Sequence, residues 1–293
     1  MLISYLKYSH RILTNLALCL VLIAVALTPT LVSSDEPEFF DIPYAYGEWN
    51  IGQRMDESVL RYCVDQRDSD WEVANEIANA IAGALMLEPK QYLVKRTFVV
   101  EDFTVLYGML LEHCDIHMGF KLIPGGVIPN WVTMTRPYYE TQYVFVAADT
   151  NINKLADLAP GGLIGATMGT SAHIRLVSYL RALPSEQRWP TYPFGTNDLA
   201  LEALLKGTVD VALVWAPTLW AQQLKDPNYE KLHVIDPSPQ LPTRLGVGAI
   251  LLSDETFMRA AIDEAISALV SDGTIQKIID TYGFPAKAGH GEN

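Results

Sequence analysis

The sequence predicts an α/β protein made of two lobes, each with a parallel sheet and covering helices. Short segments rich in β-branched apolar residues alternate with amphipathic segments of helical period, which is typical of βαβ units. This alternation runs from about residue 59 to residue 149 and then begins again. The chain has 293 residues, which is enough for two domains of ordinary size.

Residues 1–34 have the three parts of a secretory signal peptide. Lys7 and Arg11 form a basic start, residues 16–27 form an apolar core, and small residues precede a cleavage point before Asp35. The alternative is an uncleaved anchor helix, but the apolar core is shorter than the ~20 residues of a membrane span. The signal predicts a periplasmic protein with no stable membrane span after cleavage.

The first lobe is predicted to follow an irregular arm. Residues 35–57 are acidic and aromatic and show no regular period, so we expect an arm without helices or strands. The first helix is indicated by apolar residues that recur every four positions, namely Val73, Ile77, Ile81 and Leu85. The elements predicted around it are strands over 59–65, 91–100 and 114–120 and a second helix over 102–113.

The second lobe repeats the same order, and a helical pair follows it. A strand over 142–149 leads into a strand, turn and helix within 156–183, and then a helix, turn and strand within 198–215. A further strand is expected over 246–253. The last two helices are separated at Asp272-Gly273, and the first of them has an apolar face made by Met258, Ile262, Ile266 and Leu269.

The charge balance argues against nucleic-acid binding. Lys plus Arg is 21 and Asp plus Glu is 34, a formal charge of -13. An acidic surface repels phosphate backbones, and no cluster of basic residues offsets it. We therefore expect a small-molecule ligand or a protein partner.

Cysteine usage fits an exported protein. Cys19 lies in the signal segment, which leaves Cys63 and Cys114 in the mature chain. Two cysteines in an oxidising compartment predict a disulfide, and the alternative is two small buried apolar residues.

Four segments stand out by their order and spacing along the chain. They are "LLEHCDIHMGF", "TRPYYETQYVFVA", "GLIGATMGTSAHIRL", and "LEALLKGTVDVALVW" together with the ending "AISALVSDGTIQKIIDTYGF". Together they resemble the type 2 periplasmic solute-binding proteins of the amino-acid-binding kind, family 3. The resemblance implies an α/β fold of two lobes with two crossover strands and a central cleft. It implies that lobe 1 spans 58–146 and 247–293, and that lobe 2 spans 147–246.

The helix start at Thr170 and Ser171 matches the turn that holds the anionic group of the ligand in that family. Free backbone N–H groups and the helix dipole favour an anion there. The alternative is that Thr170 is only a helix cap. Two charged ligand contacts of the family are missing, because Ile128 stands where the family has an arginine and Trp215 where it has an aspartate. A free amino acid is therefore a poor candidate ligand.

Trp215 offers an aromatic face and one N–H donor, so it suits a flat or largely apolar organic ligand. The alternative is that Trp215 only packs between the lobes. Further candidates for contact with a ligand, placed near the expected cleft, are Asp65, Trp71, Phe120 and Lys121, with Trp131 as a possible wall and Arg136 as a second basic group.

Within the family, "LRYCVD", "HCDIHMGF" and "VTMTRPYYETQYVFV" resemble the binding-protein homologues that accompany periplasmic quinoprotein (methanol-type) dehydrogenases. This implies an accessory role with such a dehydrogenase, or binding of an aromatic or organic anion. The main alternative is the receptor of an ABC importer, with its permease as partner. A remote alternative is a dehydratase-like enzyme.

The sequence gives little reason to expect catalysis, a cofactor or a metal. His113, Asp115 and His117 would share one face of a strand, a metal-like spacing, but this strand starts far from the expected cleft. "GTSAH" lacks the glycines that flank the serine in a nucleophile elbow, and no pair of carboxylates is evident. His173 at a helix start is the remaining acid–base candidate. We therefore expect a binding protein that is not an enzyme.

Overall fold

The structure is a computed structural model that describes residues 58–95, 103–123 and 125–289. The predicted signal segment, the predicted arm and the end of the strand predicted over 91–100 lie outside these residues. None of the helices in the described ranges has the length and apolar character needed to cross a bilayer.

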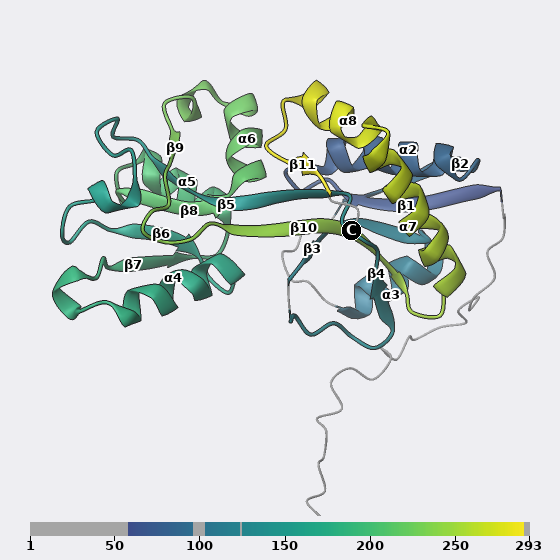
Figure 1. The fold of residues 1–293 in the computed structure, drawn as a ribbon, viewed down its shortest axis with the longest axis horizontal. Coiled ribbons are helices and arrows are strands. Elements are labelled where there is room, and N and C mark those ends of the chain that lie inside the picture. Colours follow the sequence, from purple (N-terminus) through teal and green to yellow (C-terminus); the bar gives the residue numbers. More distant parts are fainter. Residues whose placement is uncertain (1–57, 96–102, 124, 290–293) are drawn as a thin grey trace, which may run out of the picture. The chain divides into compact units, whose positions relative to one another are not determined.

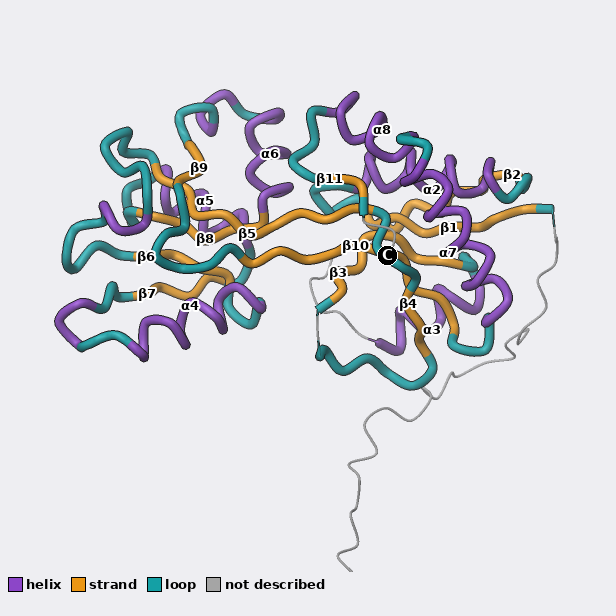
Figure 2. The backbone as a smooth tube through the Cα atoms, viewed as in Figure 1, coloured by secondary structure: helices purple, strands orange, loops and turns teal. Residues whose placement is uncertain are grey.

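The described part is an α/β structure organised around one mixed sheet (Figures 1 and 2). The strand order is β2-β1-β3-β10-β5-β8-β6-β7, with β4, β9 and β11 paired at the sides. The main-path strands are β1 (Val59–Asp65), β2 (Glu88–Val94), β3 (Ile116–Leu122), β5 (Tyr139–Ala147), β6 (Ile164–Thr167), β7 (Thr191–Phe194), β8 (Val211–Trp215) and β10 (Thr243–Leu252).

Each half of the sheet contains a parallel trio of strands. In the first half β1 lies between β2 and β3, and in the second half β6 lies between β7 and β8. We call these the first half and the second half of the protein. Parallel strands need helical crossovers, and the sequence supplies them in each half, which confirms the predicted βαβ order.

Strands β5 and β10 connect the two halves (Figure 1). Residues 139–143 of β5 pair with β10, and residues 143–147 pair with β8. In turn β10 pairs with β3 in the first half. Both strands are buried along most of their length, as expected for strands covered on both faces. They are the two crossover strands that the resemblance implied.

The first half contains the helices α2 (Trp71–Ala84), α3 (Phe103–Glu112), α7 (Thr256–Ser271) and α8 (Thr274–Tyr282). Helices α2, α7 and α8 pack against one another, and α3 contacts β10. The predicted apolar stripe of α2 is confirmed, since Val73, Ile77 and Ile81 are fully buried, and α2 contacts β1, α7 and α8. Asp272 and Gly273 separate α7 from α8 as predicted, with Gly273 at φ 82°, a left-handed conformation that favours glycine.

The second half contains three helices, α4 (Ser171–Ala182), α5 (Asn197–Leu205) and α6 (Ala216–Lys225). Helix α6 was not predicted, and it begins directly after β8 with Pro217 in its first turn, a position that tolerates proline. Other unpredicted elements are short, namely β4 (Val132–Met134), β7, β9 (His233–Ile235) and β11 (Lys287–Ala288). Strands this short have too few residues to show a clear period.

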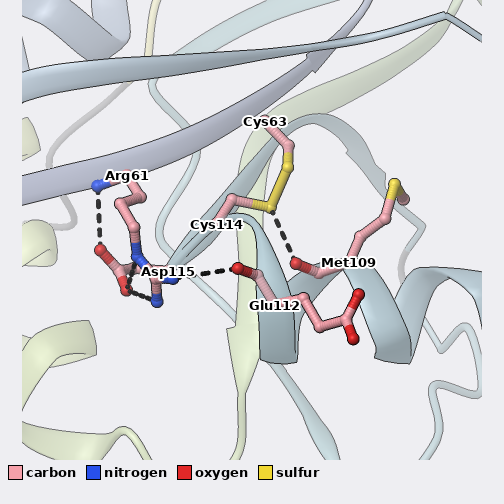
Figure 3. A network of polar contacts seen from close by, with 6 residues as sticks. All are labelled: Arg61, Cys63, Met109, Glu112, Cys114 and Asp115. Carbon is pink, nitrogen blue, oxygen red and sulfur yellow. Dashed lines mark hydrogen bonds and ion pairs between the residues drawn. A yellow bond between two sulfur atoms is a disulfide. The ribbon is translucent and has the colours of Figure 1, made fainter. Parts of the chain in front are cut away.

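A disulfide between Cys63 and Cys114 confirms the predicted pairing (Figure 3). Their Cα atoms lie 5.6 Å apart, and both residues are fully buried. Next to it, Arg61 and Asp115 form an ion pair of 2.6 Å, and the backbone N–H of Arg61 also donates to this carboxylate. The disulfide and the ion pair both tie β1 to the segment that precedes β3.

Candidate functional site

Trp215 lies at the last position of β8, where the strand passes into α6. Its backbone N–H donates to the side-chain oxygen of Asn197, 3.2 Å away, and the same oxygen accepts from the hydroxyl of Thr167. The indole is 3% exposed. Strand β8 ends at Trp215, as the sequence predicts. The backbone of Trp215 is held by Asn197, which is itself bonded to Thr167.

Two side chains cover the indole of Trp215. The ring of Tyr143, from β5, lies 4.9 Å away at a tilt of 57°. The ammonium of Lys121, from β3, lies 5.1 Å from the ring centroid, which is within the range of a cation–π interaction. A ligand could stack on this face of the indole only if Lys121 moved away.

Further contacts join the two halves near this point. The hydroxyls of Ser69 and Thr218 lie 3.4 Å apart. The rings of Trp220 and Phe284 meet edge to face at 5.1 Å. Ser69 precedes α2 and Thr218 lies in the first turn of α6, so the hydroxyl contact connects the starts of two helices from different halves. The ring contact connects α6 to the segment after α8. We use the name junction for the residues of these two contacts together with six others, namely Asp68, Asp70, Lys121, Tyr139, Tyr143 and Trp215.

Asp70 is a buried carboxylate of the junction. It stands at the N-cap position of α2, but its side chain makes no capping hydrogen bond and instead accepts from the hydroxyl of Tyr139. Burial raises the pKa of Asp70, although the Tyr139 hydrogen bond and the nearby Lys121 charge oppose this rise. Burial also raises the pKa of Tyr139 well above its usual value. Tyr139 therefore remains a neutral donor to this carboxylate.

Asp68 differs from Asp70 because its side chain is exposed to solvent. Enough protein still surrounds it that desolvation, together with the Asp70 charge, raises the pKa of Asp68 to about 7. A Cβ atom on Gly119 would lie 3.2 Å from its carboxylate oxygen, which places this carboxylate against β3, two residues before Lys121.

Asp65, a predicted ligand contact, is already paired in the structure. Its carboxylate accepts from the guanidinium of Arg67, with an ion pair of 2.6 Å, and the residue is 7% exposed. Burial opposes ionisation of Asp65, but the Arg67 hydrogen bonds and charge outweigh it and lower the pKa. A ligand would have to compete with Arg67 for this carboxylate.

The other predicted aromatic residues occupy different positions. Trp71 is the first residue of α2 and packs partly buried against the main core. Phe120 meets the ring of His117 edge to face at 5.3 Å and packs, with Trp131, against the cluster that surrounds the disulfide. The structure thus groups Phe120 and Trp131 with the core of the first half, whereas Trp215 packs in the main core cluster.

At the start of α4 the hydroxyl of Thr170 caps the helix. It accepts from the backbone N–H of His173 at 3.1 Å and donates to the carbonyl of Thr167 at 2.9 Å. The hydroxyl oxygen of Ser171 is buried and has no hydrogen-bond partner among the described residues. Burial raises the pKa of Tyr143, opposed by Lys121 and by a hydrogen bond with Thr170, so this helix start lies beside the junction.

The three residues of the metal-like motif contact other residues of the protein. Asp115 pairs with Arg61, His113 stacks on Tyr92 at 4.3 Å, and buried His117 contacts the carbonyl of Met118 at 2.9 Å. Strand β3 begins at Ile116, so the expected common strand face of these three residues does not form. Among the residues that the structure describes, no group of three or more His, Cys, Asp or Glu side chains could hold a metal ion.

Several junction residues were not predicted from the sequence. Asp68 and Asp70 are two of them, and their carboxylates lie close enough for the Asp70 charge to raise the pKa of Asp68. The others are Tyr139, Tyr143 and Thr218. The signal for them was weak, since "DSD" before a helix reads as an ordinary cap and the two tyrosines read as core residues of a strand.

Comparisons with known proteins define the fold class. No protein-family model matches the chain, and no curated protein matches it. A histidine kinase sensor domain with similarity to periplasmic binding proteins gives a TM-score of 0.56 at 16% identity, covering 80% of this chain and 100% of that one. A mutant of ArgBP from T. maritima gives 0.52 at 18% identity, covering 77% and 95%.

A third solved structure is that of the periplasmic binding protein XoxJ from Methylobacterium extorquens AM1. Its TM-score is 0.50 at 19% identity, and the match covers 80% of this chain and 100% of that one. At identities this low the similarity shows the fold alone. The chain has the two-lobed α/β fold of the type 2 periplasmic binding proteins, as the resemblance implied.

Proposed function

We propose that the chain is an exported binding protein, not an enzyme, that holds a small organic ligand at the junction. The observation that carries this proposal is the contact of Lys121 with Trp215, which places a charged group from one half on an aromatic face from the other. Binding proteins of this architecture close two halves over a ligand by a hinge motion. The first proposed lobe comprises residues 58–146 and 247–293, and the second comprises residues 147–246. Strands β5 and β10 are proposed as the hinge.

The proposed ligand carries an anionic group at the start of α4. The Ser171 hydroxyl is buried and has no hydrogen-bond partner within the described part of the chain, which supports this proposal, as do the backbone N–H groups of a helix start. Thr170 contributes to the site by capping the helix, because its own hydroxyl already makes two hydrogen bonds. An aromatic or other organic acid fits this site better than a free amino acid, since the charged contacts for an α-amino acid are missing at Ile128 and Trp215.

We further propose that the protein serves a periplasmic quinoprotein dehydrogenase system as an accessory. The support is the sequence resemblance of the cysteine and "TRPYY" segments to that branch, together with the predicted signal peptide at 1–34. A pull-down from a periplasmic extract tests this role. Recovery of a quinoprotein dehydrogenase supports it, whereas recovery of an ABC permease would make the protein an importer receptor.

The binding function is tested by a thermal-shift screen of organic acids, amines, amino acids and pyrroloquinoline quinone. A ligand that binds only the folded state raises the melting temperature in a concentration-dependent way. We expect at least one organic acid to do so in the wild type, and less in Ser171→Ala. The bound compound should be recovered unchanged by mass spectrometry. Conversion of the compound would instead make the Asp68–Asp70 pair part of an enzyme.

A further inference from the structure

Helix α4 has an exposed face that the proposed ligand site does not use. The apolar side of this helix is buried in the main core cluster and consists of Ala172, Leu176 and Leu180. The other side is exposed to solvent and carries Ile174, Arg175, Ser178 and Arg181. We call these residues the α4 face. Their spacing of three, four and seven positions places them on one side of the helix, and Figure 1 shows α4 at the border of the second half.

The charge of the α4 face is opposite to that of the chain. The chain has a formal charge of -13, whereas α4 contains two arginines and no acidic residue. In the part of the chain that the structure describes, the guanidinium groups of Arg175 and Arg181 form no ion pair and no hydrogen bond. The described residues therefore leave both charges available to a partner.

A third arginine extends this basic surface at the end of the helix. The guanidinium of Arg188 donates to the carbonyls of Leu183 and Arg181, at 2.8 and 3.0 Å. A cation is stabilising there, because the last carbonyls of a helix lack partners within it. The carboxylate of nearby Glu186 accepts from the hydroxyl of Ser185 at 2.8 Å. Arg188 is thus held in place beside Arg181 with its positive charge exposed.

The composition of the α4 face fits a protein partner. Arginine can hold a carboxylate through two parallel N–H···O bonds, and arginine is enriched at protein interfaces. Ile174, which is 59% exposed, adds an apolar contact beside these charges. A membrane fits less well, because a helix that lies in a bilayer surface needs a broad apolar face, and the apolar side of α4 is buried in the core.

A second copy of the chain also fits less well. A two-fold dimer places the same surface of both copies together, so the arginines of one α4 face would meet those of the other. Like charges brought together across an interface oppose association. The complementary surface is therefore acidic and belongs to a different protein.

We propose that the α4 face is a docking surface for a protein partner that presents acidic side chains. This surface is separate from the junction, since Arg181 lies about 15 Å along the helix from Ser171. All of its residues belong to the second half, so the partner needs no contact with the first half. The inference does not depend on which compound binds at the junction.

Carbodiimide cross-linking tests the docking directly. This reagent joins lysine amines to carboxylates and does not couple arginine, so Arg181→Lys places a reactive amine on the α4 face and keeps the positive charge. The purified variant is treated with the reagent in a periplasmic extract, and the joined peptides are identified by mass spectrometry. We expect position 181 to be joined to an aspartate or glutamate of another protein. Exposed Lys277 of α8, which is reactive in the same sample, should not be joined to that protein.

Charge reversal supplies a second readout on the wild-type background. Arg175→Glu/Arg181→Glu should lower recovery of the cross-linked partner in a pull-down about tenfold, because like charges would then face each other. The control Lys225→Glu/Lys277→Glu changes the net charge equally at exposed positions of α6 and α8 and should keep the recovery. About 1 M salt, which shortens the Debye length to about 3 Å, should also lower recovery by the wild type. An unchanged melting temperature shows that the variants are folded.

Several outcomes overturn the inference. One is an Arg181→Lys variant that forms no adduct with another protein, and another is equal recovery by the wild type and Arg175→Glu/Arg181→Glu. An adduct of position 181 with the acidic segment 35–57, or with a second copy, would assign the α4 face to this chain itself. Binding to phosphatidylglycerol vesicles that only the charge-reversed α4 variant loses would assign it to a membrane. The thermal-shift screen judges the ligand-binding function separately.

Discussion

The carboxylates of Asp68 and Asp70 lie two residues apart in the chain but have different surroundings. Asp70 is buried and receives a hydrogen bond from Tyr139, whereas Asp68 is exposed beside β3. Each carboxylate makes ionisation of the other more costly, because like charges at short range repel in a partly desolvated site. The Lys121 charge lowers the pKa of Asp68, but burial and the Asp70 charge outweigh it and raise that pKa to about 7.

The raised pKa of Asp68 predicts a pH-dependent stability. Its pKa is about 7 in the folded protein and near 3.8 when unfolded, so the folded state binds the proton more tightly. By linkage, ionisation of Asp68 lowers the free energy of unfolding as the pH rises from about 4 to about 7, and this loss persists above pH 7. Asp68→Asn should therefore raise the melting temperature at pH 8 and change it little at pH 4.

Melting curves from pH 4 to pH 8 check this expectation. Asp254→Asn, which removes an exposed carboxyl group before α7, is the control and should show no such trend. An Asp68→Asn variant whose melting temperature differs from the wild type by the same amount at every pH would contradict the assigned pKa.

Among the elements, the start of α4 carries both a helix cap and the proposed anion contact. The Thr170 hydroxyl caps this helix, and the Thr196 hydroxyl caps α5 by the same kind of bond to the third residue after it. Thr170→Ala and Thr196→Ala should each lower the free energy of unfolding by about 1 kcal/mol, and Thr170→Ser should restore it. Denaturant unfolding measures these values. A much larger loss for Thr170→Ala would show that the second hydrogen bond of the Thr170 hydroxyl, to the carbonyl of Thr167, also stabilises the protein.

The disulfide joins β1 to the segment before β3, two elements separated by 51 residues in the chain. Closing a loop of this size restricts the unfolded chain, and removing the disulfide should cost about 2–4 kcal/mol. Urea unfolding with and without reductant measures this cost. The double variant Cys63→Ala/Cys114→Ala should be less stable than the wild type by a similar amount and insensitive to reductant. A wild type whose unfolding does not respond to reductant would contradict this prediction.

The elements that could be predicted from the sequence are those with a strong apolar period. Helix α2 and helix α7 are examples, because their buried residues recur at helical spacing. Strand β7 could not be predicted, because none of its residues is buried and one of them is Pro193. Helix α6 was missed because the apolar run of β8 continues into it, and no residue separates the two elements.

At the scale of the whole molecule, the proposed function depends on contacts between residues that are distant in the sequence. The crossover strands could be predicted, because the family resemblance covers both of them. The contact of Lys121 with Trp215 could not, since it depends on how the two halves meet across β5 and β10. The sequence indicated an aromatic residue at this position, but not the cation that covers it.

The contact between Ser69 and Thr218 allows a test of whether ligands enter between the halves. Their hydroxyl oxygens lie 3.4 Å apart, so a disulfide in Ser69→Cys/Thr218→Cys should lock this contact. We expect the oxidised variant to lose the thermal shift caused by a ligand, and the reduced variant to regain it. The wild type with the same reductant is the control. Unchanged binding by the oxidised variant would mean that the ligand site lies elsewhere or stays open.

The most direct measurement is a crystal structure of the protein with the compound that gives the largest thermal shift. The account predicts that this compound lies between β3 and β8, with Lys121 moved away from the indole of Trp215 and an anionic group near Ser171. A compound bound at another surface, with Lys121 still on the indole, would contradict it.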